Sequence, residues 1–445
     1  MKKKTLNRRL TILPLMMATY FMVSGGPYGL EDLIGGAGYG WAIAILIITP
    51  LIWSLPTGLM VAELSSAVPD EGGYYVWVRR ALGPFWGFQE SWLSLAASIF
   101  DMAIYPTLFV LYLQRLWPWA GEGGHAVVVG AAMIVLCTAW NLAGASAVGE
   151  GSAWMGLVLL APFAVVSAVA VMHPGAVTHH AAGNRDLLGG LMIAMWNYMG
   201  WDNASTVAGE VERPQKTYPI AILGAVALVT VTYLVPVAAM AWARVPLTAW
   251  QDGAWADVAG MIAGHWAEVA VVVGGILSAV GIFNALVMSY TRLPAVMAQD
   301  GYLPKILAKT SARTEVPYVS VVVCAAAWML SLGLSFTHLV LLDMLLYGLS
   351  LVLEFAALVA LRVKEPQLAR PFRVPGGTWA ALLLGVPPTV LVLLGIVRNR
   401  SERLGDVSAF TLGAAVVALG CAFYAIARWR KVRADVTGLA ETKAD

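Results

Sequence analysis

Four polar residues in one apolar stretch could hold a cation or carry protons. Ser94, Ser98, Asp101 and Tyr105 follow the i, i+4, i+7, i+11 spacing, which places them on one face of a helix. If this stretch crosses a membrane, its carboxylate is costly and is treated as functional by default. We therefore expect the stripe to line a cavity in which Asp101 meets a substrate or protons, with a structural pair as the alternative.

The stretch SGGPYGLED, residues 24–32, interrupts another apolar run with glycines, a proline and two acids. Pro27 cannot donate a hydrogen bond, and Gly25 and Gly26 are poor helix formers. Irregular backbone at membrane depth is tolerated only where protein or a watery cavity satisfies its polar groups. We expect two half-helices that meet at 24–27, whose free amides suit an anion and whose free carbonyls suit a cation.

A second interruption, MWNYMGWDNAS, begins at Met195 and places Gly200 among polar side chains in an apolar run. Interruptions in corresponding spans of two halves indicate the binding site of an inverted-repeat transporter. Close packing of helices at small residues is the alternative. Trp196 precedes this break, where an aromatic ring can close over a ligand as a gate.

Acids near the two breaks are candidates for proton coupling. Glu31 follows the first break and Asp202 the second, and Asp101 is the third candidate; for Glu31 a structural hydrogen bond is the alternative. Asp343 and Glu354 share a helix face without an assigned role. The apolar runs hold no matching set of Lys or Arg, which favours a cationic substrate or a proton relay. Three further acids are expected to be solvated near the cytoplasmic surface: Glu63, Glu210 and Glu212.

Composition identifies a membrane protein, because 59% of the 445 residues are hydrophobic and only 12% are charged, against about 25% charged residues in soluble proteins. Cys137, Cys324 and Cys421 lie in apolar runs and indicate neither disulfides nor a metal site. No H-E-x-x-H, G-x-S-x-G or P-loop motif occurs. We expect no enzymatic activity, no cofactor, no metal and no nucleic-acid partner.

Apolar run lengths predict an all-α polytopic protein, since about 20 apolar residues cross the hydrocarbon core. The twelve predicted spans are 11–34, 40–66, 84–117, 125–145, 153–172, 187–209, 218–242, 267–296, 317–334, 337–362, 378–397 and 408–428. The positive-inside rule places both termini in the cytoplasm. Arg398, Arg400 and Arg403 break this rule because they share one external loop; an error in the last two spans is the alternative explanation.

Several motifs resemble the amino acid–polyamine–organocation transporter superfamily over nearly the whole chain. They are AELSSAVPDEGGYYVWVRRALGPFWGF (62–88), ASTVAGEVERPQKTYP (204–219), TRLPAVMAQDGYLP (291–304) and RPFRVPGG (370–377). SGGPYGLED, SIFDMAIYP and WDNASTVAGE are most similar to its polyamine-uptake branch.

The resemblance implies a leucine-transporter-like fold with a 5+5 inverted repeat, twelve spans, alternating access and broken helices 1 and 6. The expected parts are an N-terminal tail (1–10), a first repeat (11–172), a second repeat (187–362), two added helices (378–428) and a C-terminal tail (429–445). In the family, the first break takes the carboxylate or amine end of the substrate, and Trp196 matches the gate. Leu286 stands where some family antiporters carry an aromatic, and 153–172 lacks the lysine that one branch uses for protons. The expected substrate-binding residues are Ser24, Gly25, Gly26, Tyr28, Ala97, Ser98, Asp101, Tyr105, Trp196, Asn197, Asp202, Asn203 and Asn284.

These observations predict a plasma-membrane secondary transporter that imports a cationic amine or cationic amino acid, coupled to protons or, alternatively, to sodium. A neutral amino acid symporter and an amino acid exchanger are alternatives among transporters, and a cation channel is the alternative outside that class. The sequence does not indicate an oligomeric state.

Overall fold

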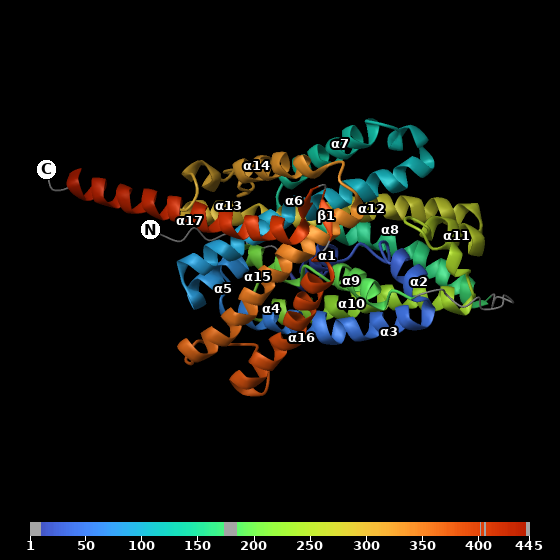
Figure 1. The fold of residues 1–445 in the computed structure, drawn as a ribbon, viewed down its shortest axis with the longest axis horizontal. Coiled ribbons are helices and arrows are strands. Elements are labelled where there is room, and N and C mark those ends of the chain that lie inside the picture. The colour runs from blue at the N-terminus through green and yellow to red at the C-terminus, as the bar shows by residue number, and fades with distance from the viewer. Residues whose placement is uncertain (1–9, 173–184, 401, 405, 442–445) are drawn as a thin grey trace.

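The computed structural model describes residues 10–172, 185–400, 402–404 and 406–441, and most of them are helical. Figure 1 shows long helices packed into one bundle, beyond one end of which α17 (Ala409–Glu441) projects. Helices α5 (Gly73–Leu82) and α13 (Arg292–Gln299) lie toward that end, whereas α2 (Glu31–Ala37) and α11 (Trp255–Ala263) lie toward the opposite end. Residues 1–9 and 442–445 of the two predicted tails lie outside the described residues.

Eight helical stretches of the described chain are long and apolar enough to cross a membrane. They are Tyr39–Ala67, Pro84–Leu116, Trp154–Met172, Pro214–Trp242, His265–Gln299, His338–Lys364, Gly377–Arg398 and Ala409–Lys431. All eight coincide with predicted spans. The other four predicted spans, 11–34, 125–145, 187–209 and 317–334, contain shorter helices, so the total of twelve stays a prediction.

The remaining bounds complete the element order. The α-helices are α1 (Ile12–Val23), α3 (Tyr39–Thr49), α4 (Leu55–Ala67), α6 (Pro84–Leu116), α7 (His125–Asn141), α8 (Ala145–Met172), α9 (Leu187–Asn197), α10 (Pro214–Trp242), α12 (His265–Tyr290), α14 (Tyr318–Trp328), α15 (Phe336–Lys364) and α16 (Gly377–Arg398). A π-helical turn, η1 (Pro50–Ser54), joins α3 to α4. The 3-10 segments are η2 (Pro118–Gly121), η3 (Trp201–Glu210), η4 (Leu247–Ala249), η5 (Lys305–Ala308) and η6 (Met329–Ser331). Strands β1 (Arg403–Leu404) and β2 (Val407–Ser408) form a short antiparallel pair.

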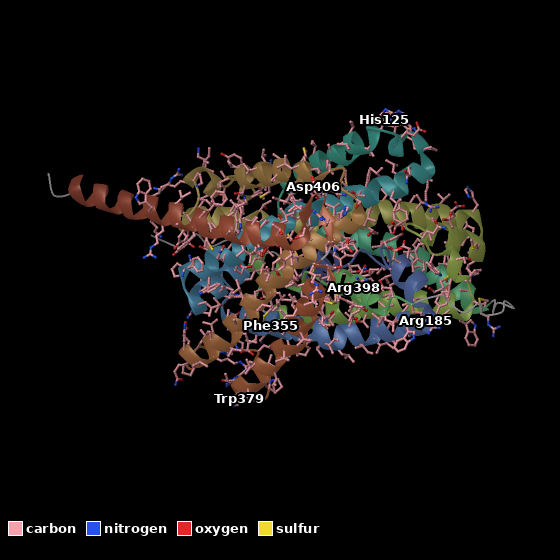
Figure 2. The ribbon with its side chains drawn as sticks, viewed as in Figure 1. His125, Arg185, Phe355, Trp379, Arg398 and Asp406 are labelled. Atoms are coloured by element: carbon pink, nitrogen blue, oxygen red, sulfur yellow. The ribbon has the colours of Figure 1, made fainter. Side chains whose placement is uncertain are left out.

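The outside of the bundle exposes many large apolar side chains, and several acids are buried within its largely apolar core. Trp379 projects from the edge of the bundle in Figure 2 and is 77% exposed. Leu136 and Leu330 are also mostly exposed, whereas acids such as Asp101 and Asp343 are buried. Such exposure of large apolar side chains is expected where acyl chains surround the molecule.

The helix breaks occur where the sequence predicts them. Helix α1 ends at Val23 and α2 begins at Glu31, and the intervening backbone is extended at Ser24 and left-handed at Gly26 (φ +89°). Helix α9 ends at Asn197, and η3 begins after Gly200 (φ +97°). Glycine takes these positive φ values without the clash that a Cβ atom would cause.

The two breaks pack directly against each other. A Cβ atom at Gly200 would lie 2.6 Å from the carbonyl oxygen of Met22. The side-chain amide of Asn197 donates a hydrogen bond of 3.2 Å to the carbonyl oxygen of Gly29. Glycine at position 200 therefore permits the close approach that brings both interrupted segments to one place.

The prediction that Glu63 is solvated is wrong. Its carboxylate is fully buried, forms an ion pair with Arg362 and accepts a hydrogen bond of 2.7 Å from the backbone amide of Val374. Arg370 lies 3.5 Å from the same carboxylate. A buried charge needs this pairing because it loses its hydration. Arg362 is 299 positions from Glu63 in the sequence.

Arg292 also pairs inside the protein. Its guanidinium is buried and lies 2.7 Å from the carboxylate of Glu210. Arg292 and Arg362 are therefore buried basic residues near the ends of predicted spans, and each already has an acidic partner.

Candidate functional site

A partly open cavity lies between the two helix breaks. Segments from α1, α6, α9, α10, α12 and α15 surround it. The expected site residues that line it are Ser24, Gly25, Tyr28, Asp101, Tyr105, Trp196, Asn197 and Asn203. The structure therefore brings together eight residues chosen from three separate stretches of sequence.

Asp101 is the carboxylate of this cavity. It is 4% exposed, and its Oδ1 accepts a hydrogen bond of 2.6 Å from the hydroxyl of Tyr105. Its Oδ2 accepts one of 3.0 Å from Tyr290 on α12. A carboxylate oxygen has two acceptor sites, so both oxygens can still accept from a ligand. The described residues that line the cavity include no Lys or Arg.

Trp196 closes the cavity against the first break. Its ring lies against Gly29, where a Cβ atom would approach within 2.9 Å of it. Asn197, the next residue, is anchored by its bond to the carbonyl of Gly29, and its own carbonyl accepts a hydrogen bond of 2.7 Å from Tyr233. Trp196, the expected gate, thus sits on a segment that is tied to both α10 and the opposite break.

The first break presents backbone groups to the cavity. The amide of Gly26 donates to the hydroxyl of Ser24 at 3.1 Å. The amide of Gly25 has no hydrogen-bond partner among the described residues. Gly25 also packs against α12, since a Cβ atom there would lie within van der Waals overlap of Ser278. One backbone donor is therefore available for an acceptor group of a ligand.

Five expected site residues do not line the cavity: Gly26, Ala97, Ser98, Asp202 and Asn284. The hydroxyl of Ser98 donates to the carbonyl of Leu95 and accepts a hydrogen bond from the indole of Trp328. The side chain of Asn284 accepts a hydrogen bond of 2.7 Å from Asn141. The geometry gives these two side chains structural partners.

Asp202 does not line the cavity itself but contacts it through one intervening side chain, that of Tyr347. Its carboxylate accepts a hydrogen bond of 2.5 Å from the hydroxyl of Tyr347, which lines the cavity. That hydroxyl also accepts a hydrogen bond of 3.1 Å from the amide of Gly200. Tyr347 therefore connects Asp202 to both the second break and the cavity.

Glu31 is held by the protein itself. Its two carboxylate oxygens accept hydrogen bonds from the amide of Gly29 at 2.7 Å and the hydroxyl of Tyr112 at 3.1 Å. The carboxylate also stands in the first turn of α2, where the helix dipole favours a negative charge. This geometry favours the structural alternative for Glu31 over proton coupling.

Sequence reasoning missed the contribution of α15. Asp343, Tyr347, Ser350 and Glu354 repeat the i, i+4, i+7, i+11 spacing of the polar stripe on α6, and α6 packs extensively against α15. That spacing is the signal that could have identified Tyr347. Three further lining residues carried no comparable signal: Tyr233, Ser278 and Tyr290.

Buried acids accumulate between these helices without basic partners. Asp343 and Glu354 are fully buried, and none of their carboxylate oxygens has a hydrogen-bond partner among the described residues. Glu90, one turn before Ser94, is also buried, with a hydrogen bond of 2.9 Å from that serine. No Lys, Arg or His of the described chain forms an ion pair with these acids, or with Asp101 or Asp202. A buried carboxylate in such surroundings must take up a proton or meet a cation.

A model of the amino acid permease family matches residues 16–420. The chain belongs to the amino acid permease family. As a member of this family it is an integral membrane transporter and not an enzyme.

Several transporters are similar to this permease over most of its length. A probable polyamine transporter of Arabidopsis thaliana is 37% identical over 405 residues, covering 90% of this chain and 81% of its own. Polyamine transporter PUT1 of Oryza sativa subsp. japonica is 36% identical over 417 residues, with coverage of 93% and 76%. The methylthioribose transporter of Bacillus subtilis (strain 168) is 25% identical over 401 residues, with coverage of 84% and 85%.

Proposed function

We propose that this permease is a secondary active transporter that imports a cationic amine, a polyamine or a cationic amino acid, together with protons. The observation that carries the proposal is the environment of Asp101, a buried carboxylate that faces a cavity whose described lining residues include no Lys or Arg. An ammonium group of the substrate supplies the missing positive charge. The names of the plant relatives, which are polyamine transporters, favour the same class of substrate.

Aromatic rings complete the site for an amine. Trp196, Tyr28 and Tyr233 line the cavity with Asp101. A ring face attracts an ammonium ion, and the alkyl stem of an amine packs against the same ring. In this proposal Asp101 binds the charge, Trp196 covers the stem, and the breaks supply further polar groups at either end.

Proton coupling is assigned to the acids that α6, η3 and α15 place together. Asp101 and Asp202 are the two candidates, and Tyr347 links Asp202 to the cavity. A substrate ammonium at Asp101 favours the charged carboxylate there, so the proton that moves with the substrate is assigned to Asp202. Movement in the same direction follows when the site changes its opening only with substrate at Asp101 and a proton at Asp202 bound together.

Alternating access is assigned to rocking of two five-helix repeats, residues 11–172 and 187–362, within a twelve-span protein of the cell membrane whose termini are cytoplasmic. The arrangement of ion pairs supports a closed state at the end of the bundle that holds α5. Asp300 pairs there with Arg79 and accepts a hydrogen bond of 2.6 Å from Tyr75. Arg80 and Glu365 form a second pair at 2.6 Å. These contacts must separate for release on that side.

A thermal-shift panel tests the substrate class. The purified protein is heated with putrescine, spermidine, arginine, lysine, leucine or alanine at two pH values, and a ligand of the folded state raises the melting temperature by mass action. We expect stabilisation by the cationic ligands. Stabilisation by leucine and alanine alone would instead support a neutral amino acid carrier, in which the free amide of Gly25 holds the substrate carboxylate.

A further inference from the structure

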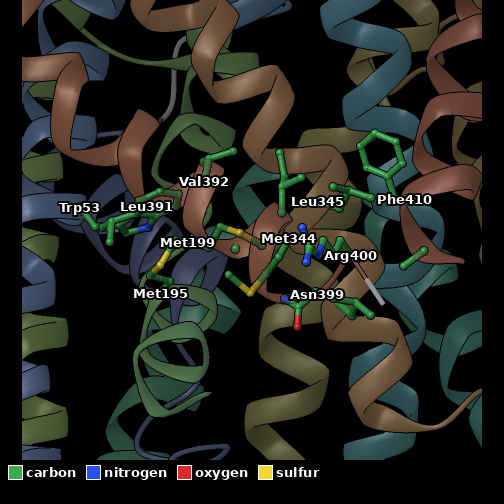
Figure 3. Close-up of a pocket in the computed structure, with 14 residues that line it drawn as sticks. Trp53, Met195, Met199, Met344, Leu345, Leu391, Val392, Asn399, Arg400 and Phe410 are labelled. Atoms are coloured by element: carbon green, nitrogen blue, oxygen red, sulfur yellow. The ribbon is translucent and has the colours of Figure 1, made fainter. Parts of the chain in front are cut away.

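A second cavity opens on the flank of the bundle (Figure 3). It lies between α9, α15, α16, the start of α17 and the π-helical turn η1. Most of its lining is apolar, and Trp53, Met344 and Leu391 are typical of it. The outer face of α16 beside it exposes Leu393 and Leu394, so the cavity borders the surface that faces acyl chains.

One positive charge stands at this cavity. Figure 3 shows Arg400 beside Met344 and above Asn399, and Arg400 and Asn399 both line the cavity. The guanidinium of Arg400 is exposed and has no ion pair or hydrogen bond with any described residue. The two neighbouring arginines are engaged elsewhere, since Arg398 lies 3.4 Å from Asp186 and Arg403 donates to the carbonyl of Asp406 at 2.7 Å.

We propose that this cavity binds an anionic phospholipid, with an acyl chain between α15 and α16 and the phosphate on Arg400. A guanidinium binds phosphate through several hydrogen bonds in a fixed geometry. An acyl chain fills a recess that is lined by Met, Leu and Val side chains. The proposal also gives a role to one of the three arginines in a loop that the positive-inside rule would leave without them, Arg400.

The lipid site shares a wall with the central cavity. Met199, in the break between α9 and η3, lines both cavities. Trp53 lines the lipid cavity, and its indole donates a hydrogen bond of 3.1 Å to the carbonyl of Tyr198 in the same break. A lipid that fills the recess therefore supports the interrupted segment from the side opposite the central cavity.

Lipid retention by the full-length protein tests the proposal. The delipidated protein in detergent is mixed with phosphatidylglycerol or phosphatidylcholine of identical acyl chains, and bound lipid is counted by native mass spectrometry. We expect Arg400→Gln to lower phosphatidylglycerol retention about fivefold, the effect of one basic residue near an anionic lipid, and to leave phosphatidylcholine retention unchanged. The matched control is Arg403→Gln, which removes a charge from the same loop but not from the cavity.

A second pair of variants tests the recess itself. Ile396→Trp fills the cavity, whereas Leu393→Trp adds the same ring to the exposed face of the same helix. We expect the first change to reduce retention of phosphatidylglycerol and to remove the rise in melting temperature that this lipid causes, and the second to do neither. Equal losses from Arg400→Gln and Arg403→Gln, or wild-type retention by Ile396→Trp, would overturn the proposal.

Discussion

The carboxylate of Asp101 accepts hydrogen bonds from two protein side chains and also faces the central cavity. Tyr105 and Tyr290 each donate one hydrogen bond to it, which fixes the orientation of the carboxylate. Neither phenol neutralises its charge. The arrangement therefore holds a negative group in place for a cation that arrives from outside.

Replacing Asp101 with Asn removes the charge and keeps the shape of the side chain. We expect spermidine affinity to fall about tenfold to a hundredfold, the value of a hydrogen bond to a charged group. Isothermal titration calorimetry with the purified variant measures this change. Glu402→Gln, an exposed acid in a loop, controls for net charge. Wild-type affinity in Asp101→Asn would remove Asp101 from the substrate site.

The buried ion pair of Glu63 and Arg362 leads us to a prediction about the stability of the protein. Breaking a buried ion pair leaves an uncompensated charge, so Glu63→Gln should destabilise the protein by about 3–5 kcal/mol. The exposed pair of Arg80 and Glu365 offers the control, because Glu365→Gln should cost about 1 kcal/mol or less. Thermal unfolding in one detergent compares the variants. Similar melting temperatures for the two would contradict the structural role of Glu63.

At the scale of elements, the breaks depend on glycines whose positions are set by neighbouring segments. Gly29 has φ +86°, and a Cβ atom there would lie 2.9 Å from the ring of Trp196. Gly29→Ala should therefore lower stability by about 1–2 kcal/mol through its backbone alone and should displace the gate. Spermidine affinity is the second readout, and we expect it to fall as well.

Gly36→Ala is the matched control for this change. Gly36 is an exposed residue of α2 with open space at its Cβ position, so alanine there should raise stability slightly through helix propensity. If Gly29→Ala behaved like Gly36→Ala in both measurements, the contact between the first break and Trp196 would not matter for binding.

The sequence predicts those features that depend only on residues within a turn or two of helix, such as the helix breaks and the polar face around Asp101. Pro27 and Gly200 mark the breaks because their backbone properties act within one turn, and the stripe around Asp101 follows from helix geometry alone. The partners of Ser98 and Asn284 could not be predicted, since Trp328 and Asn141 approach them only in the folded bundle. Glu63 was misjudged for the same reason, because Arg362 is distant in the sequence.

At the scale of the whole molecule, the two polar stripes place a group of buried acids inside a bundle whose core and exterior are otherwise largely apolar. Helices α6 and α15 supply Glu90, Asp101, Asp343 and Glu354, and η3 adds Asp202. The membrane class and eight spans were predictable because long apolar runs need no tertiary information. The twelve-span total and the inverted repeat also need the four shorter predicted spans, and the length and composition of these helices do not decide whether they cross the membrane.

Uptake of radiolabelled spermidine into proteoliposomes tests the central claim most directly. Vesicles that contain the purified protein receive an inward proton gradient, with unlabelled spermidine or leucine as competitor and a protonophore as control. We predict accumulation that spermidine blocks, leucine does not block, and the protonophore or Asp101→Asn abolishes. Accumulation of labelled leucine in place of spermidine, or spermidine uptake that continues unchanged without the gradient and in Asp101→Asn, would contradict it.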